Sequence, residues 1–178
     1  MHKYIIFCIL IFTLFSGKAQ EIEAPRLSPL EVVSMRYDDT YVKIVYSKPA
    51  RRGREVFGNI VPYDEVWRTG ANEATEITTT RDILIAGDTL HAGTYSLFTI
   101  PAEDKWTIIF NSDLGLWGSY NYREDLDVLR FEVQPEQMET DYESFTIEYL
   151  KKGLQETEVA MMWDWTIVKF PLEFIVED

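Results

Sequence analysis

The chain has 178 residues and a formal net charge of −13. An acidic balance of this size disfavours nucleic acid and anionic membranes as partners, because the field of the whole molecule repels both. Its one cysteine, Cys8, lies in an N-terminal segment that we expect to be removed, and His91 is the only histidine beyond that segment. A disulfide, a thiol nucleophile and a multi-histidine metal site are therefore excluded, and we expect no cofactor and no metal.

Residues 1–19 have the pattern of a secretory signal peptide. Lys3 provides a basic start, residues 4–15 are almost wholly apolar, and small residues lead to a cleavage point after Ala19. The apolar run is shorter than the roughly 20 residues that cross a bilayer, which argues against a permanent anchor. A lipoprotein signal at Cys8 is the alternative, but bulky Phe7 precedes that cysteine instead of a small residue. The pattern predicts an exported protein, periplasmic or extracellular, without membrane insertion after cleavage.

Residues 20–30 carry two prolines without periodicity and are predicted to form an extended lead-in, and residues 31–178 a single β domain. Period-two alternation dominates that domain and is typical of half-buried antiparallel strands. The predicted apolar faces are Val42, Ile44 and Tyr46; Trp106, Ile108 and Phe110; Leu129, Phe131 and Val133; Phe145, Ile147 and Tyr149; and Val168, Phe170, Leu172, Phe174 and Val176.

Turn residues separate these runs at short intervals, as in Ala86-Gly87-Asp88. The pattern predicts an all-β fold, an antiparallel β-sandwich or related barrel of about nine or ten strands. Helix is limited to one short turn within residues 60–67. Pro171, inside the last alternating run, indicates an edge position or a bulge, because proline donates no ladder hydrogen bond.

The first candidate site is a cluster of cations. Arg51, Arg52 and Arg54 follow Lys48 closely, and Gly53 lets the backbone approach a ligand. Arginine presents a planar fork of donors that matches carboxylate, phosphate or sulfate, so several on one loop can bind an anion. The alternative is a solvated hairpin loop whose cations pair with the abundant Asp and Glu of the chain.

The second candidate is the run Trp67-Arg68-Thr69-Gly70-Ala71-Asn72. A Trp-Arg pair is typical of a guanidinium lying on an indole face or of a buried ion pair, and Thr-Gly-Ala-Asn is turn chemistry. In one interpretation Arg68 and Asn72 point into a pocket floored by Trp67. In the other, Trp67 fills the core while Arg68 and Asn72 are internal staples under a loop.

Other candidates are less specific. Residues 116–122 mix Trp117, Tyr120 and Tyr122 with Asn and Gly, as a surface loop that stacks on a sugar ring would, although packing at the end of a sandwich explains them too. Carboxylates are too numerous to select a catalytic pair, and the catalytic residues stay unassigned. His91 is expected on the surface beside a hairpin turn, without an identifiable partner.

Several motifs resemble the DUF2911 family. They are Tyr46-Ser47-Lys48-Pro49, Gly53-Arg54-x-Val56-Phe57-Gly58, Val61-Pro62-Tyr63, Val66-Trp67-Arg68-Thr69-Gly70-Ala71-Asn72-x-Ala74-Thr75, the run from Ala92 to Pro101, and the run from Trp106 to Asn111. The resemblance covers about residues 25–176 and implies an exported, single-domain, mainly β protein of Bacteroidetes-type bacteria. It supplies no activity. Lys48 stands where the family commonly has arginine.

Three hypotheses follow. The first, favoured over an enzyme, is a non-catalytic binding domain for a small anionic molecule or acidic glycan. Its ligand-binding residues would be Arg51, Arg52, Arg54, Trp67, Arg68 and Asn72. The second is a carbohydrate-active hydrolase or lyase with Asp or Glu as acid and base. The third makes the same residues structural and places function in protein–protein contact. The burial of Arg68 and its partners distinguish the first hypothesis from the third.

Overall fold

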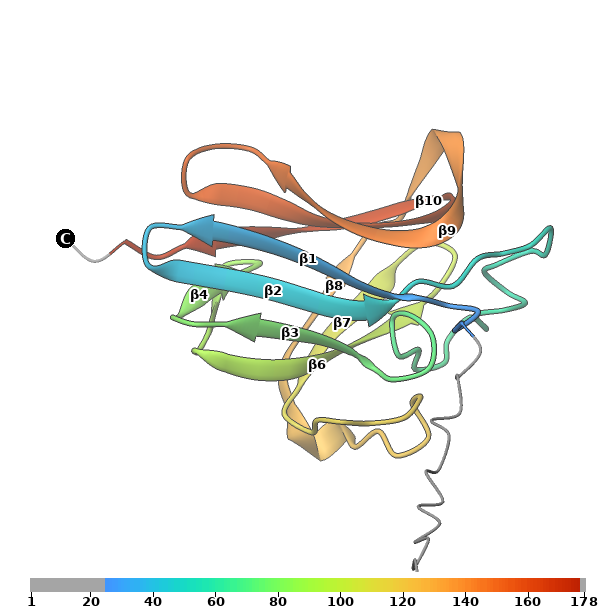
Figure 1. Cartoon of the computed structure of the whole chain (residues 1–178), viewed down its shortest axis with the longest axis horizontal. Helices are drawn as coiled ribbons and strands as arrows, with labels where there is room; N and C mark the ends of the chain where they lie inside the picture. The colour runs from blue at the N-terminus through green and yellow to red at the C-terminus, as the bar shows by residue number, and fades with distance from the viewer. Residues whose placement is uncertain (1–24, 177–178) are drawn as a thin grey trace, which may run out of the picture.

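The computed structural model describes residues 25–176 and consists of two antiparallel sheets packed face to face (Figure 1). The predicted signal peptide, residues 1–19, and the first part of the lead-in lie outside the described residues. No strand of one sheet is hydrogen-bonded to a strand of the other, so the fold is the predicted open sandwich and not the barrel.

The larger sheet has six strands in the order β1-β2-β3-β6-β7-β8. These are β1 Leu30–Tyr37, β2 Thr40–Ser47, β3 Thr75–Thr79, β6 Gly93–Pro101, β7 Trp106–Asn111 and β8 Asp127–Val133. Each is antiparallel to its neighbour, with register pairs such as Ile44–Ile77 between β2 and β3. The long segment between β2 and β3 contains both candidate sites and lies at one end of the sandwich, beside the bend of β9 (Figure 1).

The smaller sheet has four strands in the order β5-β4-β10-β9. These are β4 Ile83–Ile85, β5 Asp88–Leu90, β9 Glu136–Lys151 and β10 Glu156–Phe174. The pairing of β9 with β10 shifts register on both sides of Asp164, which has φ 55°. Such a bulge bends the strand and re-aims its side chains. Pro171 follows the last pair with β9, at Ile167, so its missing N–H interrupts no ladder bond on that side.

The core lies between the sheets and consists of the apolar faces that alternation predicted. Val42, Ile44 and Phe110 are fully buried, and Trp106 and Phe145 are nearly so. Alternation places such residues on one face because successive strand side chains point to opposite sides of a sheet. The prediction for Val176 is wrong: that side chain is 47% exposed, because β10 ends at Phe174.

The short helical turn expected within residues 60–67 is absent. Val61 and Trp67 instead form isolated bridges with Phe57 and Thr99, which hold this segment extended between turns. Within residues 25–176 the only helix is a 3₁₀ turn, η1 Glu124–Leu126. None of the described residues forms a helix long and apolar enough to span a membrane.

Candidate functional site

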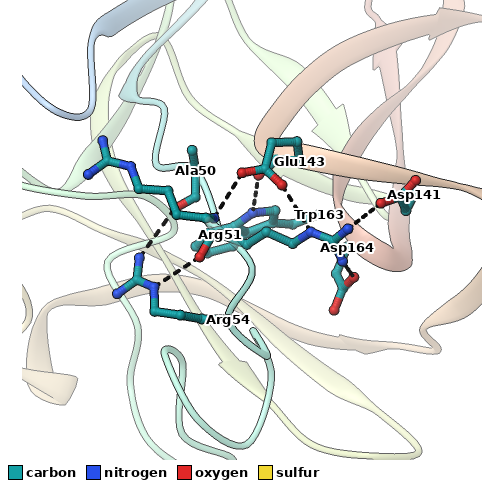
Figure 2. Close-up of polar contacts among 8 residues, drawn as sticks. Ala50, Arg51, Arg54, Asp141, Glu143, Trp163 and Asp164 are labelled. Carbon is teal, nitrogen blue, oxygen red and sulfur yellow. Dashed lines mark hydrogen bonds and ion pairs between the residues drawn. The ribbon is translucent and has the colours of Figure 1, made fainter.

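The cation loop, residues 48–54, is hydrogen-bonded to the edge of β9. Ala50 bridges Ser144, the Arg51 N–H donates to the Glu143 carbonyl at 2.9 Å, and the Phe145 N–H donates to Pro49 at 2.9 Å. Figure 2 shows this loop against the bulged part of β9 and β10. These backbone hydrogen bonds therefore fix the position of the loop, and so of its arginine residues, against β9.

Arg51 is surrounded by carboxylates of the protein itself. Its Nε lies 3.0 Å from Glu143 Oε2, while Nη1 and Nη2 pair with Asp164 and Asp141 (Figure 2). The Arg52 N–H and then the Arg51 side chain hold the pKa of Glu143 below its usual range. Hydrogen bonding to Glu143 raises the pKa of Arg51. The fork that we expected to bind an external anion is thus occupied by three internal ones.

Arg52 and Arg54 are exposed and donate mainly to backbone carbonyls. Arg52 Nη2 lies 2.9 Å from the Leu27 carbonyl, and Arg54 Nε lies 2.9 Å from the Arg51 carbonyl. Arg54 Nη2 also reaches the Ala50 carbonyl at 3.3 Å. Carbonyl partners carry no net charge, so both guanidinium groups keep their positive field toward solvent.

Trp67 is a core residue, only 7% exposed. Its indole packs against Phe145, Trp106 and Trp163 with ring centroids 5.0, 6.3 and 5.9 Å away, and its Nε1 donates to the Gly70 carbonyl at 3.0 Å. Buried tryptophans typically satisfy their N–H in this way. The ring lies between the sheets, where no external ligand reaches it.

Asn72 and its neighbour Glu73 form contacts with the described part of the lead-in, residues 25–30. Asn72 adopts φ 58°, a left-handed conformation that asparagine tolerates, and its Nδ2 lies 3.4 Å from the Ser28 carbonyl and 3.3 Å from Ser47 Oγ. Glu73 pairs with Arg26 at 2.9 Å, and the pKa of Glu73 is lowered by its own backbone N–H and by Arg26. The described part of the lead-in is therefore fastened to the domain.

Arg68 points away from Trp67. Trp67 bridges Thr99 and faces the core, so the next side chain points to the outer face of the six-stranded sheet, where Ala74, Phe98 and Ile109 form a second apolar cluster. The Arg68 Nε is buried without a hydrogen-bond partner, and burial lowers the pKa of the guanidinium. The side chain as a whole is half-buried.

Residues 112–122, the aromatic loop, lie next to Arg68. The Ala74 N–H donates to the Leu116 carbonyl at 2.8 Å, and the Gly118 N–H donates to Asn72 at 2.9 Å. Trp117 and Tyr120 are 60% and 85% exposed, and the electrostatic influence of Tyr120 extends to the Arg68 guanidinium. This neighbourhood is not visible in the sequence, because more than 40 positions separate the two segments.

The six predicted ligand residues do not form one site. The cation loop lies against β9 and β10, Trp67 lies in the core, and Arg68 faces outward. Two hollows among the described residues, of about 600 Å³ beside Asp39 and Arg81 and about 300 Å³ beside Lys105 and Glu132, are lined by none of the six.

Other chemistry-bearing groups are placed as follows. The carboxyl groups with a shifted pKa are Glu73, Asp82 and Glu143, and each pKa is lowered. His91 is exposed, as expected, but has a partner that we did not predict: its Nδ1 lies 2.8 Å from Asp82 Oδ2. Within residues 25–176 no group of His, Cys, Asp and Glu is arranged to hold a metal ion.

A family model described as a protein of unknown function, DUF2911, matches residues 28–172. No curated protein and no solved structure shows a significant match to the chain. The matched region includes the cation loop, Trp67 to Asn72 and the aromatic loop.

Proposed function

Because the chain belongs to the DUF2911 family, whose model names no activity, we propose a function from the geometry: a non-catalytic, exported binding domain. Its ligand is an anion, either a small molecule or an acidic glycan, that pairs with Arg68. The position of Arg68 beside the exposed aromatic loop supports the placement of the site on the outer face of the larger sheet.

The unpaired guanidinium of Arg68 is the observation that carries this proposal. Every other arginine of residues 25–176 contacts a carboxylate, a backbone carbonyl or an aromatic ring, namely Arg26, Arg36, Arg51, Arg52, Arg54, Arg81, Arg123 and Arg130. A partly desolvated charge without a counter-ion is costly, and buried charges in proteins are normally paired. An anion that supplied charge-assisted hydrogen bonds would offset that cost.

The remaining predicted residues contribute indirectly. The backbone carbonyl of Asn72 accepts the Gly118 N–H and so connects the aromatic loop to the segment that carries Arg68. Trp67 anchors the same segment in the core. Arg52 and Arg54 keep exposed charge, while Arg51 fixes the loop that carries them. The proposal therefore narrows the contact residues from six to Arg68 and adds Trp117 and Tyr120.

The binding hypothesis expects Arg68 to be open to a pocket, and Arg68 lines neither hollow described above. The structural hypothesis expects a sealed Arg68 with carboxylate partners, and no described carboxylate pairs with Arg68. The staples it predicts are instead Asn72 on the lead-in and Arg51 on β9 and β10.

Titration calorimetry at low ionic strength, where exposed charges are least screened, tests the proposal. The probes are phosphate, citrate, free glucuronate and an acidic polysaccharide, and the variant is Arg68→Gln. Loss of a charge-assisted pair is expected to weaken binding about ten-fold or more. Arg36→Gln is the matched control, because Arg36 is exposed and contacts only the Tyr41 ring. If no probe binds, or if Arg68→Gln binds as tightly as the parent, the proposal is wrong.

A further inference from the structure

Arg68 is half-buried and lies beside an open surface, because the aromatic side chains next to it extend into solvent. It lines neither of the two hollows described above. Small ligands usually bind in concave sites that bury most of their surface. A long polymer needs no such enclosure, because its contacts are spread along the chain. The open surface therefore favours the glycan over the small molecule.

The exposed rings of the aromatic loop provide the apolar part of this surface. Trp117 and Tyr120 are 60% and 85% exposed, although such large side chains are normally buried at least in part. Tyrosine and tryptophan combine a flat apolar face with a polar edge, which suits the C–H face and the hydroxyl rim of a sugar ring. A cation beside two such rings matches a sugar that also carries a carboxylate.

The loop is held rigidly enough to present these rings in a fixed position. Ser96 Oγ donates to the Asp113 carbonyl at 2.6 Å, and the Gly115 N–H donates to Glu76 at 3.1 Å. A Cβ on Gly118 would lie 2.8 Å from the Tyr120 ring, so that ring packs directly on the glycine. Preorganisation of this kind reduces the entropy lost on binding.

A second set of bonds fixes the end of the loop to the sheet. Tyr122 Oη donates to Asp127 Oδ2 at 2.6 Å, and Asn111 Nδ2 donates to Asp127 Oδ1 at 2.8 Å and to the Arg123 carbonyl at 2.8 Å. Arg130 pairs with Asp127 at 3.2 Å. These hydrogen bonds hold the loop on the sheet without the exposed rings of Trp117 and Tyr120. Packing within the protein therefore does not explain why these two side chains are aromatic.

The net charge limits how acidic the glycan can be. A protein with a formal charge of −13 repels a dense polyanion, and one unpaired arginine does not compensate for many ligand charges. A glycan with occasional carboxylates among neutral sugars avoids most of this repulsion and still supplies one anion to Arg68.

We infer that Arg68, Trp117 and Tyr120 form a binding platform for a sparsely carboxylated polysaccharide, in which Arg68 pairs with a uronic acid and the two rings stack on sugars. This inference rests on the proposed function and specifies its ligand class. The two parts of the platform act separately: Arg68 recognises the carboxylate by charge, and the aromatic rings recognise the neighbouring sugars.

Affinity electrophoresis through gels containing polysaccharide tests the inference. The probes are glucuronoxylan, the same polymer after reduction of its carboxyl groups, and polygalacturonate, which is densely charged. The parent should be retarded most by glucuronoxylan. Carboxyl reduction and Arg68→Gln should each weaken retention about ten-fold. Trp117→Ala and Tyr120→Ala should reduce it by a comparable factor. Trp165→Ala is the matched control, because Trp165 is 45% exposed on β10 of the other sheet.

The outcomes separate this inference from the proposed function. If small anions bind in an Arg68-dependent way but glucuronoxylan causes no retardation, the glycan inference is wrong and the anion site remains. Equal retention by the carboxyl-reduced polymer would contradict the glycan inference, while the proposed function is decided by the calorimetry with small anions. If Trp165→Ala weakens retention as much as Trp117→Ala, or if polygalacturonate binds most tightly, the platform is wrong. The reduced polymer tests the carboxylate without any change to the protein.

Discussion

Replacing Arg68 by methionine should make the protein more stable, which is the reverse of the usual effect of a substitution at a half-buried position. The Arg68 Nε is buried without a partner, and leaving a buried polar group unsatisfied costs about 1–3 kcal/mol. Because the side chain is half exposed, we take the lower end of that range. Methionine keeps an unbranched apolar stem on the sheet face that carries the second apolar cluster, and it removes the charge.

We therefore expect Arg68→Met to raise the free energy of unfolding by about 1 kcal/mol. In a chain of this length that gain corresponds to an increase in Tm of roughly 2–4 °C. Urea denaturation followed by tryptophan fluorescence measures the free energy, and scanning calorimetry measures the Tm. The same variant should lose anion binding, so stability and binding should change in opposite directions.

Arg130→Met is the matched control. Arg130 lies on the same sheet and pairs with Glu124 at 3.0 Å and Asp127 at 3.2 Å, so its replacement should lower stability by up to about 1 kcal/mol. A loss of about 1 kcal/mol or more in Arg68→Met would refute the reasoning. Such a loss would mean that the guanidinium stabilises the fold, as the structural hypothesis requires.

Three further predictions concern the rest of the fold. Trp67→Ala should lower the free energy of unfolding by about 3–5 kcal/mol in urea denaturation, because it opens a cavity among the rings of Phe145, Trp106 and Trp163. A loss below about 1 kcal/mol would contradict the buried position of Trp67. Ala86→Asn should raise the free energy of unfolding by about 0.5–1 kcal/mol, since Ala86 has φ 52° in an exposed turn and asparagine tolerates that conformation better. If the free energy does not rise, relief of backbone strain at this position is not its source. The lowered pKa of Glu143 means that its stabilisation is present above the unfolded-state pKa and is lost as the pH falls through the folded-state pKa. The urea midpoint of the parent should therefore fall on acidification below about pH 4. The variant Arg51→Gln should be less stable at neutral pH, and its midpoint should fall less. Parallel pH profiles of the two proteins would refute stabilisation of the Glu143 carboxylate by Arg51.

Local sequence patterns predicted the architecture well, because strand alternation and turn residues act over a few positions. The buried set Val42, Ile44 and Tyr46 follows from alternation alone. Errors arose where distant contacts override local preference. The segment from residue 60 to 67 has no helical turn because Trp67 bridges Thr99, a pairing that no local pattern encodes.

The candidate site could be predicted only as a set of residue types. The sequence identified Arg51, Arg52 and Arg54 as a cation cluster, but the three carboxylates on Arg51 come from β9 and β10, about 90 and 113 positions away. Likewise, the sequence did not show that Trp67 and Arg68, adjacent in the chain, face opposite sides of a sheet.

By itself, then, the sequence determined an acidic, antiparallel β chain and the two segments that carry its unusual residues, since composition and short-range periodicity are properties of the chain. Only the tertiary structure decided that Arg51 is neutralised by internal carboxylates while Arg68 keeps an unpaired charge. Whether an arginine has a counter-ion depends on which distant strands the fold brings within a few ångströms, and that distance is set by packing and not by sequence spacing.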